Sequence, residues 1–78
     1  MGSSLPVVSA KDCLRALERA GFYIVRQAGS HARLFHRTNV ELRVTIPVHG
    51  RDLPPGTLRN ILRQAQLSVE DFRSLLGS

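Results

Sequence analysis

The sequence predicts a small α+β domain in which three antiparallel strands carry helices on one face of the sheet. Two observations lead to this prediction. Apolar residues recur at helical spacing near both ends of the chain, and three short segments rich in β-branched, aromatic or alternating apolar residues lie between them. With 78 residues, the chain has room for one domain with a small core, and we assign residues 5–78 to it. We expect residues 1–4 to be a disordered end or an expression remnant.

The first helix is expected over residues 9–20. Ser9 can cap its first turn, with Asp12 at the matching capping-box position, and Gly21 supplies the left-handed residue that ends it. Its apolar stripe consists of Ala10, Cys13, Leu14, Leu17 and Ala20.

A second helix is predicted to begin within residues 54–57, because proline is tolerated in the first turn of a helix. Its buried stripe is Leu58, Ile61, Leu62 and Ala65. Ser68 can cap a short third helix, whose core residues are Phe72, Leu75 and Leu76.

Three strands are predicted, over residues 22–27, 31–37 and 41–46. The turn between the first two contains Gly29 and Ser30. The second turn is residues 38–40, and Pro47 ends the third strand.

The register of the last two strands can be inferred from the cost of burial. Alternate residues of the third strand, Leu42, Val44 and Ile46, must face the core. A two-residue turn would bury two arginines of the second strand beside them, whereas a three-residue turn buries Ala32, Leu34 and His36. Burying an unpaired arginine costs far more than exposing one phenylalanine, so we choose the three-residue turn. This register places His31 opposite Pro47 and leaves a basic, solvent-facing surface of His31, Arg33, Phe35, Arg37, Arg43 and Thr45.

The charge of the chain is concentrated in the predicted sheet. Residues 26–51 hold five arginines and one glutamate, giving +4 of the total of +5, and all three histidines. Ten of the eleven basic residues are arginine, whose planar guanidinium suits phosphate oxygens and stacks on bases. The natural partner is a polyanion, and nucleic acid is the leading candidate; a basic surface kept for solubility is the alternative that charge alone leaves open.

Other classes of protein are disfavoured by composition. Cys13 is the single cysteine and belongs to a helical apolar stripe, so no internal disulfide forms and we expect a buried thiol in a reducing compartment. No apolar run is long enough to span a membrane, and we expect a cytoplasmic protein without a membrane partner. A zinc site built from the histidines and Cys13 is not expected, because these side chains face different ways.

Several short motifs, in order and at these spacings, resemble the HicA toxins: Gly21-Phe22, Arg26-Gln27, Gly29-Ser30-His31, Thr45-Ile46-Pro47-Val48-His49 and the run from Gly56 to Leu62. The resemblance covers residues 5–72. It implies a double-stranded-RNA-binding-like α-β-β-β-α fold, here followed by a short C-terminal helix. It also implies an mRNA interferase, a metal-independent endonuclease without a cofactor, whose partner is a HicB-like antitoxin.

The family's catalytic histidine, in the Gly-Ser-His motif, falls on His31. The chain departs from true double-stranded-RNA-binding domains at the start of the second helix, where Pro54-Pro55-Gly56-Thr57 stands in place of a lysine cluster. This departure favours single-stranded RNA over a duplex, and the resemblance implies that the RNA is mRNA.

The chemistry of RNA cleavage agrees with a histidine in this role. RNA carries its own nucleophile, the 2′-hydroxyl, so cleavage needs a base, an acid for the leaving 5′-oxygen, and cations for the charge that develops at phosphorus. Histidine changes its charge between pH 5 and 8 and can serve as either acid or base. The candidate for a second acid or base is His49, which the predicted register places near the Gly29-Ser30 turn, although a structural role in its loop is an open alternative. His36 lies five residues from His31, on the opposite face, and is expected to be a partly buried, hydrogen-bonded residue.

The candidate RNA-binding residues surround His31. Gly29 and Ser30 allow close approach of a phosphate and offer backbone N–H donors, although the pair is also an ordinary turn. The phosphate-binding candidates are Arg26, Arg33 and Arg43, and Phe35 is the candidate for base stacking. A non-catalytic RNA-binding module is the alternative function that the same basic face supports.

Overall fold

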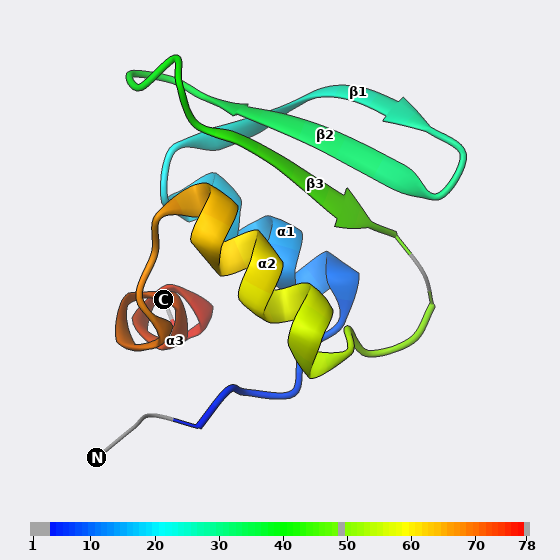
Figure 1. Cartoon of the computed structure of the whole chain (residues 1–78), viewed down its shortest axis with the longest axis vertical. Helices are drawn as coiled ribbons and strands as arrows, with labels where there is room; N and C mark the ends of the chain where they lie inside the picture. Colours follow the sequence, from blue (N-terminus) through cyan, green and yellow to red (C-terminus); the bar gives the residue numbers. More distant parts are fainter. Residues whose placement is uncertain (1–3, 49, 78) are drawn as a thin grey trace.

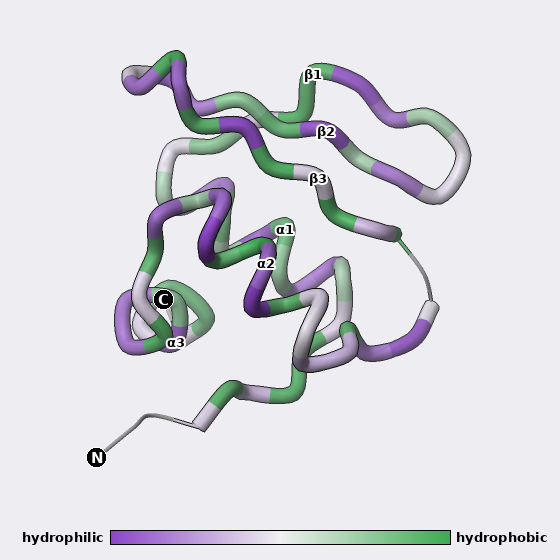
Figure 2. Tube along the Cα trace, viewed as in Figure 1, coloured by the Kyte–Doolittle hydropathy of each residue, from purple (hydrophilic) through white to green (hydrophobic). Residues whose placement is uncertain are grey.

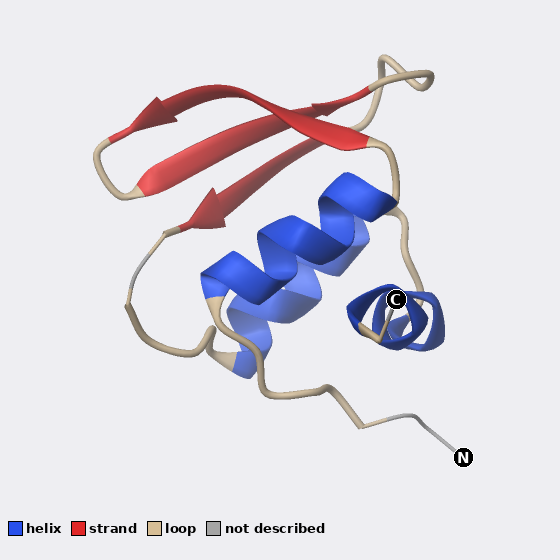
Figure 3. Ribbon diagram, turned by 180° about the vertical axis from the view of Figure 1, so that it is seen from behind, coloured by secondary structure: helices blue, strands red, loops and turns tan. Residues whose placement is uncertain are grey.

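The computed structural model describes residues 4–48 and 50–77 and shows two layers, a three-stranded sheet and a layer of helices. Both α1 (Ala10–Arg19) and α2 (Pro55–Ala65) pack against the sheet, and α3 (Val69–Leu76) packs against α1. All three helices lie on the same side of the sheet (Figure 3), so the α+β prediction is confirmed. The other side of the sheet is left uncovered by helices, as the side view in Figure 1 shows.

The helix ends follow the local chemistry of the sequence. Ser9 caps α1 by accepting a hydrogen bond at Oγ from the backbone N–H of Asp12, at 3.1 Å. Ser68 caps α3 in the same way through the N–H of Asp71, at 3.0 Å. Gly21 follows α1 with a φ of +102°, and α2 begins with a proline, as predicted.

The sheet has the order β1 (Phe22–Ala28), β2 (His31–His36), β3 (Arg43–Pro47), and both neighbouring pairs are antiparallel. His31 pairs with Pro47, and Phe35 with Arg43, so the register argued from the cost of burying arginine is confirmed. Ala32 and Leu34 are buried toward the helices, together with Val44 and Ile46 of β3. Figure 2 shows the resulting alternation of hydrophobic and hydrophilic residues along β2 and β3.

The connection between β2 and β3 is longer than predicted. The prediction extended β2 through Arg37 and began the third strand at Glu41, but the strands end at His36 and begin at Arg43. Side-chain acceptors explain the difference: His36 Nδ1 accepts the N–H of Asn39, and Asn39 Oδ1 accepts the N–H of Glu41. These local bonds take backbone groups that the ladder would otherwise use.

The two edges of the sheet differ. At the edge of β3, the backbone N–H of Thr45 donates to Oε1 of Gln64 on α2, at 3.0 Å. In β1 only Phe22 is buried, and the register shifts between Ile24 and Arg26. This places a bulge in β1, the strand that lies farther from α2.

No helix within the described residues is both long and apolar enough to cross a membrane. Residues 1–3, part of the segment expected to be a disordered end or a remnant, lie outside the described residues.

Candidate functional site

A two-residue turn places His31 at the start of β2. Ala28 pairs with His31, and between them Gly29 has a φ of +58°, the conformation that a tight hairpin with glycine at its first central position requires. The carbonyl of Ser30 accepts the backbone N–H of Val48, which ties the turn to the end of β3. The hairpin therefore holds His31 at a defined place on the open face of the sheet.

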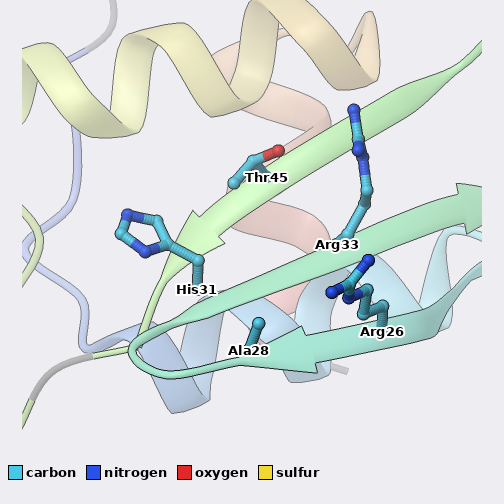
Figure 4. A pocket seen from close by; sticks show the side chains of 5 residues that line it. All are labelled: Arg26, Ala28, His31, Arg33 and Thr45. Atoms are coloured by element: carbon cyan, nitrogen blue, oxygen red, sulfur yellow. The ribbon is translucent and has the colours of Figure 1, made fainter.

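A shallow hollow of about 290 Å³ surrounds this histidine. Its lining combines all three strands of the sheet and consists of Arg26, Ala28, His31, Arg33 and Thr45. Figure 4 shows these side chains projecting from one face of the sheet. A depression this open suits an extended polymer better than a small molecule, which proteins bind in enclosed cavities.

The register explains why these residues meet. Along the outer face, one row across the sheet is Ala28, His31 and Pro47, and the next is Arg26, Arg33 and Thr45. The hollow covers the first two residues of the first row and the whole of the second.

The charges in the hollow are all of one sign. Arg26 and Arg33 are direct cross-strand partners, and like charges in that position repel. None of the described strand residues is acidic, so the sheet itself offers no carboxylate to neutralise them. A bound anion would relieve this repulsion.

Four of the predicted RNA-binding residues lie outside the hollow. Phe35 and Arg43 are cross-strand partners one row farther along, where the guanidinium carbon of Arg43 lies 5.2 Å from the centre of the Phe35 ring. Gly29 and Ser30 form the adjoining turn and do not line the hollow. A Cβ placed at Gly29 would have no other atom of the protein within 4 Å, apart from its chain neighbours, so the turn is open to an approaching group.

His36 faces the helices and has a structural role, as predicted. Its Nε2 lies 2.9 Å from the carbonyl oxygen of Ala20, and its Nδ1 accepts the N–H groups of Thr38 and Asn39. The carbonyl can only accept, so Nε2 carries the proton in this arrangement. Its ring also meets Phe22 edge to face, with centroids 4.8 Å apart.

Of the two further side chains that bear on the chemistry, Cys13 and His49, the structure describes Cys13. Burial raises the pKa of the Cys13 thiol to about 12, so this cysteine is not an activated nucleophile. His49, the candidate second acid or base, lies outside the described residues. Within the described part of the chain, no group of three or more metal-binding side chains is close enough to hold an ion.

The sequence reasoning did not assign a site role to two lining residues, Ala28 and Thr45. Both are cross-strand neighbours of predicted site residues, Ala28 of His31 and Thr45 of Arg33. The predicted register already placed Thr45 on the outer face, and pairing across both ladders was the signal that would have identified the two residues.

Comparison with known families supports a toxin. A family model described as the HicA toxin of bacterial toxin-antitoxin systems matches residues 10–67, which is most of the chain and includes the whole sheet. No curated protein sequence matches the chain. The matched region contains every residue that lines the hollow, and the chain belongs to the HicA toxin family of bacterial toxin-antitoxin systems.

Proposed function

We propose that this toxin is an endoribonuclease that cleaves single-stranded mRNA in the cytoplasm, with His31 as a proton-transfer group. The observation that carries the proposal is the combination, in one open hollow, of an exposed histidine with two arginines that no strand carboxylate neutralises. Membership of the HicA family supports it and suggests a HicB-type antitoxin as the protein partner.

The reaction needs a base, an acid and cations, which histidine and arginine side chains can supply. A base removes the proton of the 2′-hydroxyl, the 2′-oxygen forms a bond to phosphorus, and the bond from phosphorus to the 5′-oxygen breaks as an acid protonates the leaving group. His31 supplies one of these two proton transfers, and we keep His49 as the candidate for the other. Because the nucleophile belongs to the RNA, the reaction proceeds in this scheme without a metal ion or cofactor.

The arginines have a separate task. Negative charge builds on the phosphate oxygens as the pentacoordinate state forms, and fixed cations around the hollow stabilise it. Arg26 and Arg33 occupy this position across adjacent strands. The N–H groups of Gly29 and Ser30 are further candidate donors to the RNA backbone.

The proposal is tested with labelled single-stranded RNA, a chelator and the variant His31→Ala. His31 is exposed and its removal leaves the core intact, so circular dichroism should be unchanged while cleavage falls by about 10²- to 10⁴-fold. Products should end in a 2′,3′-cyclic phosphate and a 5′-hydroxyl, and the chelator should not slow their formation.

The matched control is Arg15→Gln, a loss of positive charge at an exposed position on α1, in the helix layer. It should cleave at the wild-type rate. Equal cleavage by His31→Ala in metal-free buffer would refute the assignment of His31. Salt-dependent binding of RNA that stays intact with folded wild-type protein would favour the alternative, a non-catalytic RNA-binding module.

A further inference from the structure

A second cluster lies on the outer face of the sheet, beyond the hollow. Tyr23, Phe35 and Arg43 are paired across the three strands, and they form the row that follows Arg26, Arg33 and Thr45. The guanidinium carbon of Arg43 lies 5.2 Å from the centre of the Phe35 ring, and that of Arg37 lies 5.4 Å from the centre of the Tyr23 ring. Two aromatic rings and two guanidiniums thus share one patch.

The patch is not part of the core. Its residues come from the face opposite the helices, and Tyr23 keeps 37% of its surface exposed. Each ring holds a guanidinium in place through a cation-π contact, so these two long side chains lose less conformational freedom when a ligand binds.

The patch is aligned with the hollow along β2. His31, Arg33 and Phe35 are alternate residues of this strand and project from the same face. Four residues separate His31 from Phe35, a span of about 14 Å along an antiparallel strand. A chain molecule whose phosphate lies between Arg26 and Arg33 can therefore extend over the aromatic rings.

We propose that Tyr23, Phe35, Arg37 and Arg43 form a base-stacking subsite, which binds a nucleobase a few nucleotides away from the phosphodiester at His31. Unpaired bases stack on aromatic rings and on guanidinium planes, and this binding tolerates any base because each has a π face. The inference rests on the proposed function for the identity of the ligand as RNA, and it adds that recognition depends on a base at a distance from the bond that is cleaved.

A matched-substrate binding experiment tests the subsite without using cleavage. The His31→Ala protein is titrated into a fluorescent single-stranded RNA oligonucleotide and into a series in which one nucleotide at a time lacks its base. Loss of the stacked base should weaken binding by on the order of tenfold at one position in the series. Tyr23→Leu and Phe35→Leu, added to His31→Ala, should weaken binding of the intact oligonucleotide by a similar factor and remove the sensitivity at that position.

Two further variants complete the design. Arg43→Gln changes an exposed residue and tests the patch without altering a half-buried ring. It should also reduce the abasic effect, which is the loss of binding caused by removing the stacked base from the oligonucleotide. Arg15→Gln removes the same charge from the helix layer and should keep the full abasic effect. An abasic effect that is unchanged in all three patch variants would overturn the subsite.

The proposed function and the subsite fail in different ways. If protein with His31 intact leaves RNA uncut but the abasic effect still depends on the patch, the subsite is supported and the endonuclease proposal is refuted. If the patch variants bind RNA normally and instead lose binding to the antitoxin, the surface contacts protein and the nucleobase subsite is wrong.

Discussion

Gly21→Ala should destabilise this protein strongly, although it adds only one methyl group. Gly21 has a φ of +102°, which L-residues rarely adopt, and a Cβ there would lie 2.8 Å from Nε2 of His36. That nitrogen is hydrogen-bonded to the carbonyl oxygen of Ala20 at 2.9 Å. Nδ1 of the same ring accepts hydrogen bonds from the backbone N–H groups of Thr38 and Asn39. The ring cannot move away from the methyl group without breaking these bonds.

The magnitude follows from two contributions. Forcing an alanine into a left-handed conformation costs about 1–2 kcal/mol, and losing the hydrogen bond to Ala20 costs about 0.5–1.5 kcal/mol. We expect a total of roughly 2–3 kcal/mol, a large part of the ~5–15 kcal/mol that stabilises a typical domain. At about 4–8 °C per kcal/mol for a domain of this size, the melting temperature should fall by roughly 10–20 °C.

Thermal and urea unfolding of three comparison variants, Gly29→Ala, His36→Ala and Gly21→Ala/His36→Ala, separates the two contributions. Gly29→Ala also has a positive φ, +58°, but its Cβ meets nothing within 4 Å, so it should show the conformational cost alone. In the double variant Gly21→Ala/His36→Ala, the ring is absent and the clash is relieved. The two single changes should therefore sum to more destabilisation than the double variant shows, by about 1 kcal/mol. If the effects of Gly21→Ala and His36→Ala on the free energy of unfolding are strictly additive, the proposed clash is refuted. Equal losses of stability in Gly21→Ala and Gly29→Ala would also refute it.

Two other predictions concern stability. Burial raises the pKa of the Cys13 thiol from 9.0 to about 12, so between these pH values the unfolded chain loses a proton that the folded chain keeps. The free energy of unfolding should therefore fall with rising pH, by up to about 1.4 kcal/mol per pH unit. Urea unfolding at pH 8 and pH 10.5 should show this extra loss of stability in the wild type but not in Cys13→Ala. Arg19 Nη1 donates to the carbonyl of Leu75 at 2.7 Å and connects α1 to the end of α3, so Arg19→Ala should cost about 1 kcal/mol and increase hydrogen exchange in α3, whereas Arg15→Ala, one turn earlier on α1, should do neither.

The features that could be predicted from the sequence depend on strong local or energetic preferences. The N-terminal ends of α1 and α3 were predictable, because a serine hydroxyl readily accepts a hydrogen bond from one of the free N–H groups in the first turn of a helix. The register of β2 and β3 was predictable because a slip of one residue would have buried Arg33, a cost that no alternative packing offsets. The same register correctly placed His31 and His36 on opposite faces.

Other features depend on contacts that no single segment reveals. The burial of β1 could not be predicted from its composition, because the apolar residues Ile24 and Val25 are exposed on this edge strand of the sheet. The hollow likewise depends on pairing across two ladders, which brings Arg26 and Thr45 to either side of Arg33. The contacts of Arg37 with the Tyr23 ring and of Arg43 with the Phe35 ring depend on side-chain positions that the sequence does not specify.

The division of the sheet into two faces explains how so small a protein can combine a core with an open, charged site. All the buried side chains of β2 and β3 point toward α1 and α2, so the alternate positions of these strands lie outside the core. Those positions hold His31, Arg33 and Arg43, which are exposed and take no part in the core. A substitution on this face should therefore change the binding of RNA far more than the stability of the fold, and the reverse should hold one residue away on the same strand.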